Sequence, residues 1–96
     1  MKLYCYLFVY GNGLGTSDEV SHFVDNCKDI VHWYTTMPYS FLIVSPKGAD
    51  DLCESIRNGL HKGTSKGRFI VVDTATDRNG WMPKDVWEFI RKPKPS

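Results

Sequence analysis

Apolar residues recur along this chain in two alternating spacings. Short runs in which nearly every position is apolar are typical of strands, and apolar residues repeated every third or fourth position are typical of helices packed on one side. Strand-like runs occupy residues 3–10, 30–34, 41–44 and 69–72, and helical patterns occupy residues 20–27 and 49–60. In chain order the predicted elements are therefore strand, helix, strand, strand, helix and strand.

That order predicts an α+β protein with a ferredoxin-like β-α-β-β-α-β sandwich, in which two helices cover one face of a single sheet. Pro83 suits the first turn of a short C-terminal helix that ends near Ile90. Ninety-six residues are enough for one domain and too few for two hydrophobic cores. We therefore expect a single domain over residues 1–91 and a flexible basic tail over residues 92–96.

The first strand is apolar at both its odd and its even positions, which is typical of a strand at the centre of a sheet. We expect its aliphatic face to meet the helices and its aromatic face to look out from the open side. The aliphatic face contains Leu3, Cys5, Leu7 and Val9, and the aromatic face contains Tyr4, Tyr6, Phe8 and Tyr10. Because large exposed aromatic surfaces are rare in monomers, we expect a second copy or the final helix to bury this face, with stacking on nucleic-acid bases as the alternative.

A glycine-rich connection follows the first strand and contains Gly11, Asn12, Gly13, Gly15 and Thr16. Such a turn before a helix can present backbone N–H groups to an anion. Thr16 occupies the place of the last glycine in Gly-x-Gly-x-x-Gly, and no lysine follows as in a phosphate-binding loop. Thr16 with Glu19 is also a capping-box pattern that predicts a helix start. A plain connection is the favoured interpretation, and a small-anion or nucleotide site is the alternative.

The formal net charge of +1 gives no strong general attraction to nucleic acid or to an anionic membrane. A basic stretch before the last strand contains Lys62, Lys66 and Arg68, which are able to contact phosphate, although such stretches are usually solvated loops. No histidine or carboxylate spacing is typical of a metal site, and no serine stands in a nucleophile motif. The sequence predicts no catalytic residue, no metal site and no cofactor.

The chain has three cysteines, Cys5, Cys27 and Cys53, and each falls on an apolar stripe. An odd number of cysteines at such positions is typical of buried reduced thiols, which suit a reducing cytosol. The first apolar run is too short for a membrane span and has no small-residue cleavage site after it. We therefore expect a cytoplasmic protein without a membrane segment.

Residues 80–90, GWMPKDVWEFI, resemble the closing segment of small SinR-like proteins, which are similar to the ferredoxin-like CRISPR-associated endonuclease subunit. The strand with His32, Trp33 and Tyr34, the strand after it and the strand at 69–72 fall in matching order. The resemblance implies a ferredoxin-like domain that pairs as a homodimer and can contact nucleic acid.

The related nucleases hold a metal with an aspartate just after the first strand, where this chain reads Tyr10, Gly11, Asn12 and Gly13. Hard divalent cations need oxygen ligands, usually carboxylates, and metal-assisted phosphodiester cleavage needs the cation. The resemblance therefore implies the fold and the dimer but not cleavage. We expect a non-catalytic homodimeric interaction module of SinR-like type. A nucleic-acid-binding protein or metal-dependent nuclease, and an anion binder at the glycine-rich connection, are the alternatives.

Overall fold

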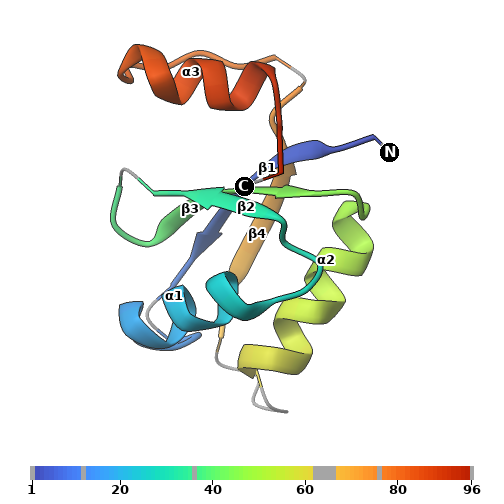
Figure 1. The fold of residues 1–96 in the computed structure, drawn as a ribbon. Coiled ribbons are helices and arrows are strands. Elements are labelled where there is room, and N and C mark those ends of the chain that lie inside the picture. The colour runs from blue at the N-terminus through green and yellow to red at the C-terminus, as the bar shows by residue number, and fades with distance from the viewer. Residues whose placement is uncertain (1, 12, 36, 62–66, 76, 96) are drawn as a thin grey trace.

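A four-stranded antiparallel sheet lies at the centre of the protein, between helices on both of its faces (Figure 1). The computed structural model describes residues 2–11, 13–35, 37–61, 67–75 and 77–95. Its elements are β1 (Tyr4–Tyr10), α1 (Ser17–Asn26), β2 (His32–Tyr34), β3 (Ser40–Ser45), α2 (Ala49–Ile56), η1 (Arg57–His61), β4 (Phe69–Asp73) and α3 (Lys84–Arg91). The expected order of strands and helices is present, and α3 confirms the expected short C-terminal helix.

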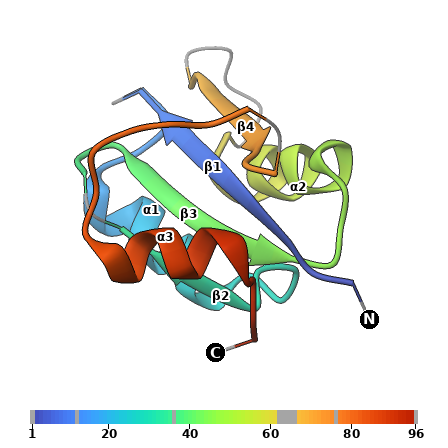
Figure 2. The same cartoon turned by 90° about the horizontal axis from the view of Figure 1, so that it is seen from above.

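The strands lie in the order β2-β3-β1-β4, so β1 is central and β2 and β4 form the two edges. The prediction that the first strand is central is confirmed. α1 and α2 cover one face of the sheet, and α3 lies on the opposite face (Figures 1 and 2). The result is an α+β fold with a four-stranded antiparallel sheet and three α-helices among the described residues.

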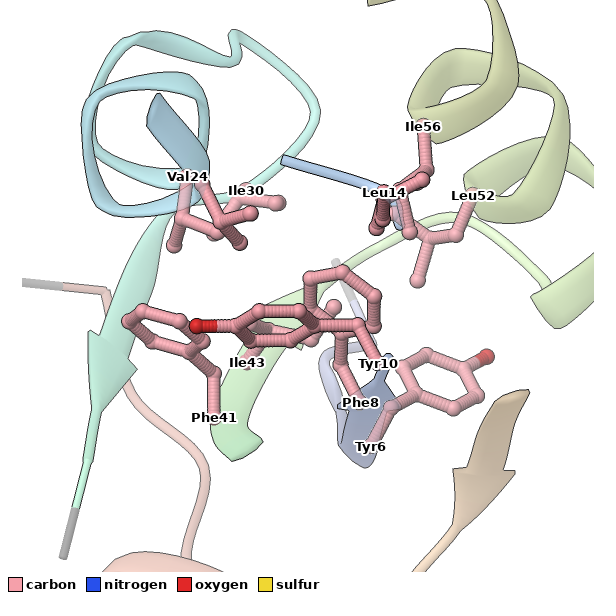
Figure 3. Close-up of a cluster of buried hydrophobic side chains, with 11 residues drawn as sticks. Tyr6, Phe8, Tyr10, Leu14, Val24, Ile30, Phe41, Ile43, Leu52 and Ile56 are labelled. Carbon is pink, nitrogen blue, oxygen red and sulfur yellow. The ribbon is translucent and has the colours of Figure 1, made fainter. Parts of the chain in front are cut away.

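The predicted orientation of β1 is wrong. The rings of Tyr6, Phe8 and Tyr10 are buried and point toward the layer formed by α1 and α2 (Figure 3). Tyr4 is half-buried and packs against the same cluster. These side chains are therefore not an open face that a second copy or nucleic-acid bases can contact.

The physical reason lies in the sizes of the facing side chains. The buried side chains that the helices present to this cluster are aliphatic and smaller than an aromatic ring, namely Val20, Val24, Leu52 and Ile56, and only the half-buried Phe23 of α1 adds a ring. Large rings on the sheet fill the space that these short side chains leave, and interiors must be packed to crystal-like density. Within the sheet, the Phe8 ring stacks on Phe41 with centroids 6.2 Å apart and meets Phe69 edge-on at 5.9 Å. Alternation along a strand defines two faces but does not say which one the helices cover.

The aliphatic face of β1 packs under α3. Cys5, Leu42 and Val44 form a second cluster with Val86 of α3, and Phe89 adds to it. Tyr34 fixes α3 to β2, because its hydroxyl donates a 3.1 Å hydrogen bond to Asp85. The short helix α3 therefore covers the part of this face formed by β2, β3 and the start of β1.

The three cysteines are free, as the odd number and the apolar stripes predict. Only Cys5 is fully buried, whereas Cys27 and Cys53 are half-buried. Among the described residues, no helix is both long and apolar enough to cross a membrane.

Candidate functional site

Part of the sheet face beside α3 is left uncovered. The exposed fractions are 37% for Val9, 57% for Ile70 and 43% for Val72. Val9 lies opposite Ile70, and Leu7 lies opposite Val72, so these side chains share one face of β1 and β4. We call Val9, Ile70 and Val72 the open strip. Figure 2 shows why it is exposed, since α3 lies over β2 and β3 and leaves β4 to one side.

The open strip adjoins an edge of the sheet. In the part of the chain that the structure describes, β4 is the last strand on its side, and its sequence is Phe-Ile-Val-Val-Asp. Natural edge strands are commonly protected by proline, lysine or a covering segment. At the other edge, the His32 ring nitrogen Nδ1 lies 3.2 Å from the Lys94 carbonyl oxygen, so the C-terminal segment lies against β2. β4 contains neither proline nor lysine, and this makes it the edge better suited to pairing with another strand.

The segment between β4 and α3 crosses the same face of the sheet (Figure 2). Trp81 in this segment is 100% exposed. Its neighbours are held in place, because Met82 packs in the cluster under α3 and the Trp87 ring lies 3.7 Å from the position of a Cβ at Gly80. The protein therefore holds a large aromatic side chain in solvent on a segment with fixed neighbours.

A cavity of about 140 Å³ lies between this segment and the sheet. Its wall is formed mainly by the apolar side chains of Leu7, Met37, Leu42, Met82, Trp87 and Ile90. Phe41 also lines it, although its ring points to the opposite face of the sheet. Its polar lining comes from Tyr34, Thr35, Ser40, Thr74, Arg78 and Asn79. Two of these groups are tied to the backbone, since Thr35 Oγ1 donates to the Ser40 carbonyl oxygen at 2.7 Å and Arg78 Nη1 donates to the Thr74 carbonyl oxygen at 2.9 Å.

The backbone of the glycine-rich connection makes bonds within the protein. The Gly11 N–H donates to the Arg68 carbonyl oxygen at 2.9 Å, and the Leu14 N–H donates to the Gly11 carbonyl oxygen at 3.0 Å. The predicted capping box is confirmed at the start of α1: the Thr16 N–H donates to Glu19 Oε1 at 2.9 Å, and the Glu19 N–H donates to Thr16 Oγ1 at 3.2 Å. The Glu19 carboxylate thus occupies the position at the helix start that an anion would use.

The other predicted contacts are only partly within the described residues. Asn12 of the glycine-rich connection and Lys62 and Lys66 of the basic stretch lie outside them. Arg68 is exposed just before β4, where its carbonyl oxygen accepts the Gly11 N–H. Within the described residues, no group of three or more His, Cys, Asp and Glu side chains is placed to hold a metal ion.

Two features of this face were not found from the sequence. Ile70 and Val72 alternate with inward-facing residues of β4, but their exposure depends on β4 being an edge strand beyond the reach of α3. Arg78 stands in a polar stretch that carries no motif, so only the path of the chain brings it to an apolar cavity. The indication in the sequence that β4 has an apolar outer face is that both sets of its alternate positions are apolar.

Comparisons of the chain with protein-family models, with curated proteins and with solved structures each find no match. The resemblance to SinR-like proteins stays a prediction.

Proposed function

We propose that this protein is a non-catalytic interaction module that forms a homodimer through the open strip and the adjoining edge of β4. The observation that carries this proposal is the exposure of Val9, Ile70 and Val72 on one face of neighbouring strands. A two-fold axis beside the strip and perpendicular to the sheet would place the same apolar patch of a second copy next to it on one face, and such a patch is complementary to itself. The proposal retains the homodimer expected from the sequence, but it moves the interface from the aromatic face of β1 to the open strip and the edge of β4.

The edge of β4 supplies the second part of the proposed interface. Two β4 strands related by a two-fold axis run antiparallel, so their outer backbone N–H and C=O groups can pair and join two sheets into one. Backbone hydrogen bonds would fix the relative orientation of the two copies, which a non-directional apolar contact does not. Trp81, fully exposed on the segment that crosses this face, is the kind of residue that often dominates binding energy at interfaces.

The affinity of the proposed dimer follows from the free energy of apolar burial and the cost of association. Full burial of one valine or isoleucine side chain contributes about 1.5–3 kcal/mol, and a two-fold interface contains each residue twice. The three residues of the open strip are already part-covered, so each contributes less than this. Association itself costs about 4–15 kcal/mol in lost freedom of motion. The open strip alone therefore does little more than offset the cost of association. A micromolar dimer corresponds to a net gain of about 8 kcal/mol, which the backbone pairing of β4 and the burial of Trp81 would have to supply.

We also propose that the fold belongs to the ferredoxin-like class. The element order β-α-β-β-α-β, the strand order β2-β3-β1-β4 and the position of α1 and α2 on one face support this assignment. The assignment concerns architecture alone, since such folds host many unrelated functions. The rings of Tyr6, Phe8 and Tyr10 are buried, so they cannot stack on nucleic-acid bases.

Light scattering with two lysine variants tests the proposal. The wild-type protein at micromolar concentration should have a mass of about 22 kDa, twice the 11.0 kDa of one chain. Ile70→Lys should give a monomer, because it places a charge in the proposed apolar interface. Met37→Lys is the matched control, since Met37 is 45% exposed in the β2–β3 connection and away from the strip. A wild-type monomer across this concentration range would refute the proposal.

A further inference from the structure

The cavity between the sheet and the β4–α3 segment is not needed for the proposed dimer. Its volume is about 140 Å³, and Leu7, Leu42, Met82 and Ile90 are among the apolar side chains that line it. Apolar cavities of about 150 Å³ are large enough to bind one benzene molecule. The cavity therefore has room for a single compact ring.

The charge on the cavity wall selects between kinds of ligand. Of the described residues that line the cavity, Arg78 alone carries a charge. Its bond from Nη1 to the Thr74 carbonyl oxygen holds the guanidinium at the wall and uses one of its five N–H groups. Thr74 is fixed in turn, because its N–H and its Oγ1 both donate to the Cys5 carbonyl oxygen, at 3.0 and 2.8 Å. A positive group is thus anchored beside an apolar cavity.

Two acidic residues, Asp73 and Asp85, lie next to residues that line the cavity. Asp85 accepts the hydrogen bond of the Tyr34 hydroxyl, but it is not among the lining residues. Asp73 accepts the Ala75 N–H at 2.9 Å and does not line the cavity either. The charge that a bound molecule would meet in the cavity is therefore the guanidinium.

We propose that this cavity binds a small monocyclic carboxylate, with the ring among the apolar side chains and the carboxylate on the Arg78 guanidinium. The planar guanidinium matches the geometry of a carboxylate and forms charge-assisted hydrogen bonds with it. The size of the cavity limits the ligand to one ring, and the single positive group favours an anion over a neutral or cationic molecule of the same shape. This inference does not depend on the protein being a dimer.

Three probes of matched shape test the charge preference: benzoate, benzyl alcohol and benzylamine. Each is titrated into isotope-labelled protein while the methyl signals of Met37 and Met82, which both line the cavity, are followed by NMR. Benzoate should bind at least about tenfold more tightly than the other two, because hydrogen bonds to charged groups are the stronger ones. Equal affinity for the three probes, or no binding of benzoate, would overturn the proposal.

Variants separate the ring site from the carboxylate site. Arg78→Gln should weaken benzoate about tenfold and leave benzyl alcohol unchanged, since Arg78 is exposed and its loss removes only the charged contact. Leu7→Phe should fill the cavity and abolish the binding of both probes, with the backbone amide spectrum showing whether the fold is kept. If Arg78→Gln binds benzoate as the wild type does, the proposed role of Arg78 is wrong.

A final pair of variants tests whether a second copy occupies the cavity instead. Ile70→Lys, which should disrupt the dimer, is expected to bind benzoate with unchanged affinity. Trp81→Ala is also expected to leave the affinity unchanged, because Trp81 is exposed and does not line its own cavity. If either substitution tightens benzoate binding several-fold, the Trp81 ring of another copy competes for the cavity, and the small-carboxylate proposal is overturned.

Discussion

Val9 lies opposite Ile70 in the pairing of β1 with β4, and both side chains are exposed on the face of the sheet that α3 leaves uncovered. An exposed apolar pair on neighbouring strands is costly in water unless something covers it. The rings of Tyr6, Phe8 and Tyr10 on β1, by contrast, are buried in the core. This relationship moves the proposed dimer contact from the rings of β1 to the strip that includes Val9 and Ile70.

Gly59 in η1 should be hard to replace. A Cβ at this position would overlap the ring of Phe23 from α1, so Gly59→Ala forces the ring or the turn to shift. We expect a loss of about 1–3 kcal/mol in the free energy of unfolding, as for other overpacked sites. Gly80→Ala is the matched control, because a Cβ there would meet only ordinary contacts with Trp87 at 3.7 Å. Urea denaturation measures both, and equal effects of the two substitutions would contradict the packing argument.

The capping box at α1 should contribute measurably to stability. Thr16→Ala removes the hydroxyl that accepts the Glu19 N–H, and we expect it to cost about 1 kcal/mol in the free energy of unfolding. Thr16→Ser keeps the acceptor and should cost much less. Both values come from denaturant unfolding at one pH. An alanine variant as stable as the serine variant would show that the cap has no net effect.

The protein should lose stability at alkaline pH. Burial is the main cause of raised pKa values for the thiols of Cys5 and Cys53 and for the hydroxyls of Tyr6 and Tyr10, and the hydrogen bond to Asp85 raises the pKa of Tyr34. Above the unfolded-state pKa values, about 8.5 for cysteine and 10 for tyrosine, the unfolded chain releases protons that the folded protein retains. The unfolded state then binds fewer protons, so the free energy of unfolding falls as the pH rises.

Thermal unfolding at a series of pH values from about 7 to 10.5 tests this expectation across the range in which thiols and phenols titrate. The unfolding midpoint should be nearly constant at first and then fall above the pKa of a free thiol. Tyr34→Phe should lessen the fall, because one of the groups with a raised pKa is removed. A midpoint that rises with alkaline pH would reverse the sign of the linkage and contradict these assignments.

The protein should not cut nucleic acid. The expectation follows from the sequence after β1, where Gly11 and Gly13 flank Asn12 and no carboxylate stands. Purified protein incubated with RNA or DNA and Mg²⁺ or Mn²⁺ should show no cleavage above background. Cleavage that a single substitution of one of the protein's own aspartates or glutamates abolishes would refute the non-catalytic interpretation.

The sequence predicts those parts of the fold that depend on local pattern. The order of the elements, the central position of β1 and the capping box of Thr16 and Glu19 all follow from spacing and neighbouring residue types. The orientation of β1 does not, because both of its faces are apolar and the choice depends on the small side chains that α1 and α2 bring to the core. Local pattern predicts the elements, and packing between distant elements decides their faces.

The candidate sites depend even more on distant contacts. Ile70 is exposed because β4 lies at the sheet edge, and Arg78 lines a cavity because the β4–α3 segment crosses the sheet above Leu7. No sequence motif predicts the exposure of Ile70 or the position of Arg78 at the cavity. The exposure of Trp81 is likewise not predicted by the sequence, since a tryptophan in an apolar segment is ordinarily expected to be mostly buried.

Isotope-filtered NMR on an equal mixture of ¹³C-labelled and unlabelled protein tests the central claim most directly, because it reports only contacts between different copies. We predict intermolecular contacts from the methyl groups of Ile70 and Val72. We also predict that Ile70→Lys abolishes these contacts and that Met37→Lys leaves them unchanged. Intermolecular contacts from α3 or from the β2–β3 connection in place of the open strip, or no intermolecular contacts at a concentration where light scattering detects a dimer, would contradict the account.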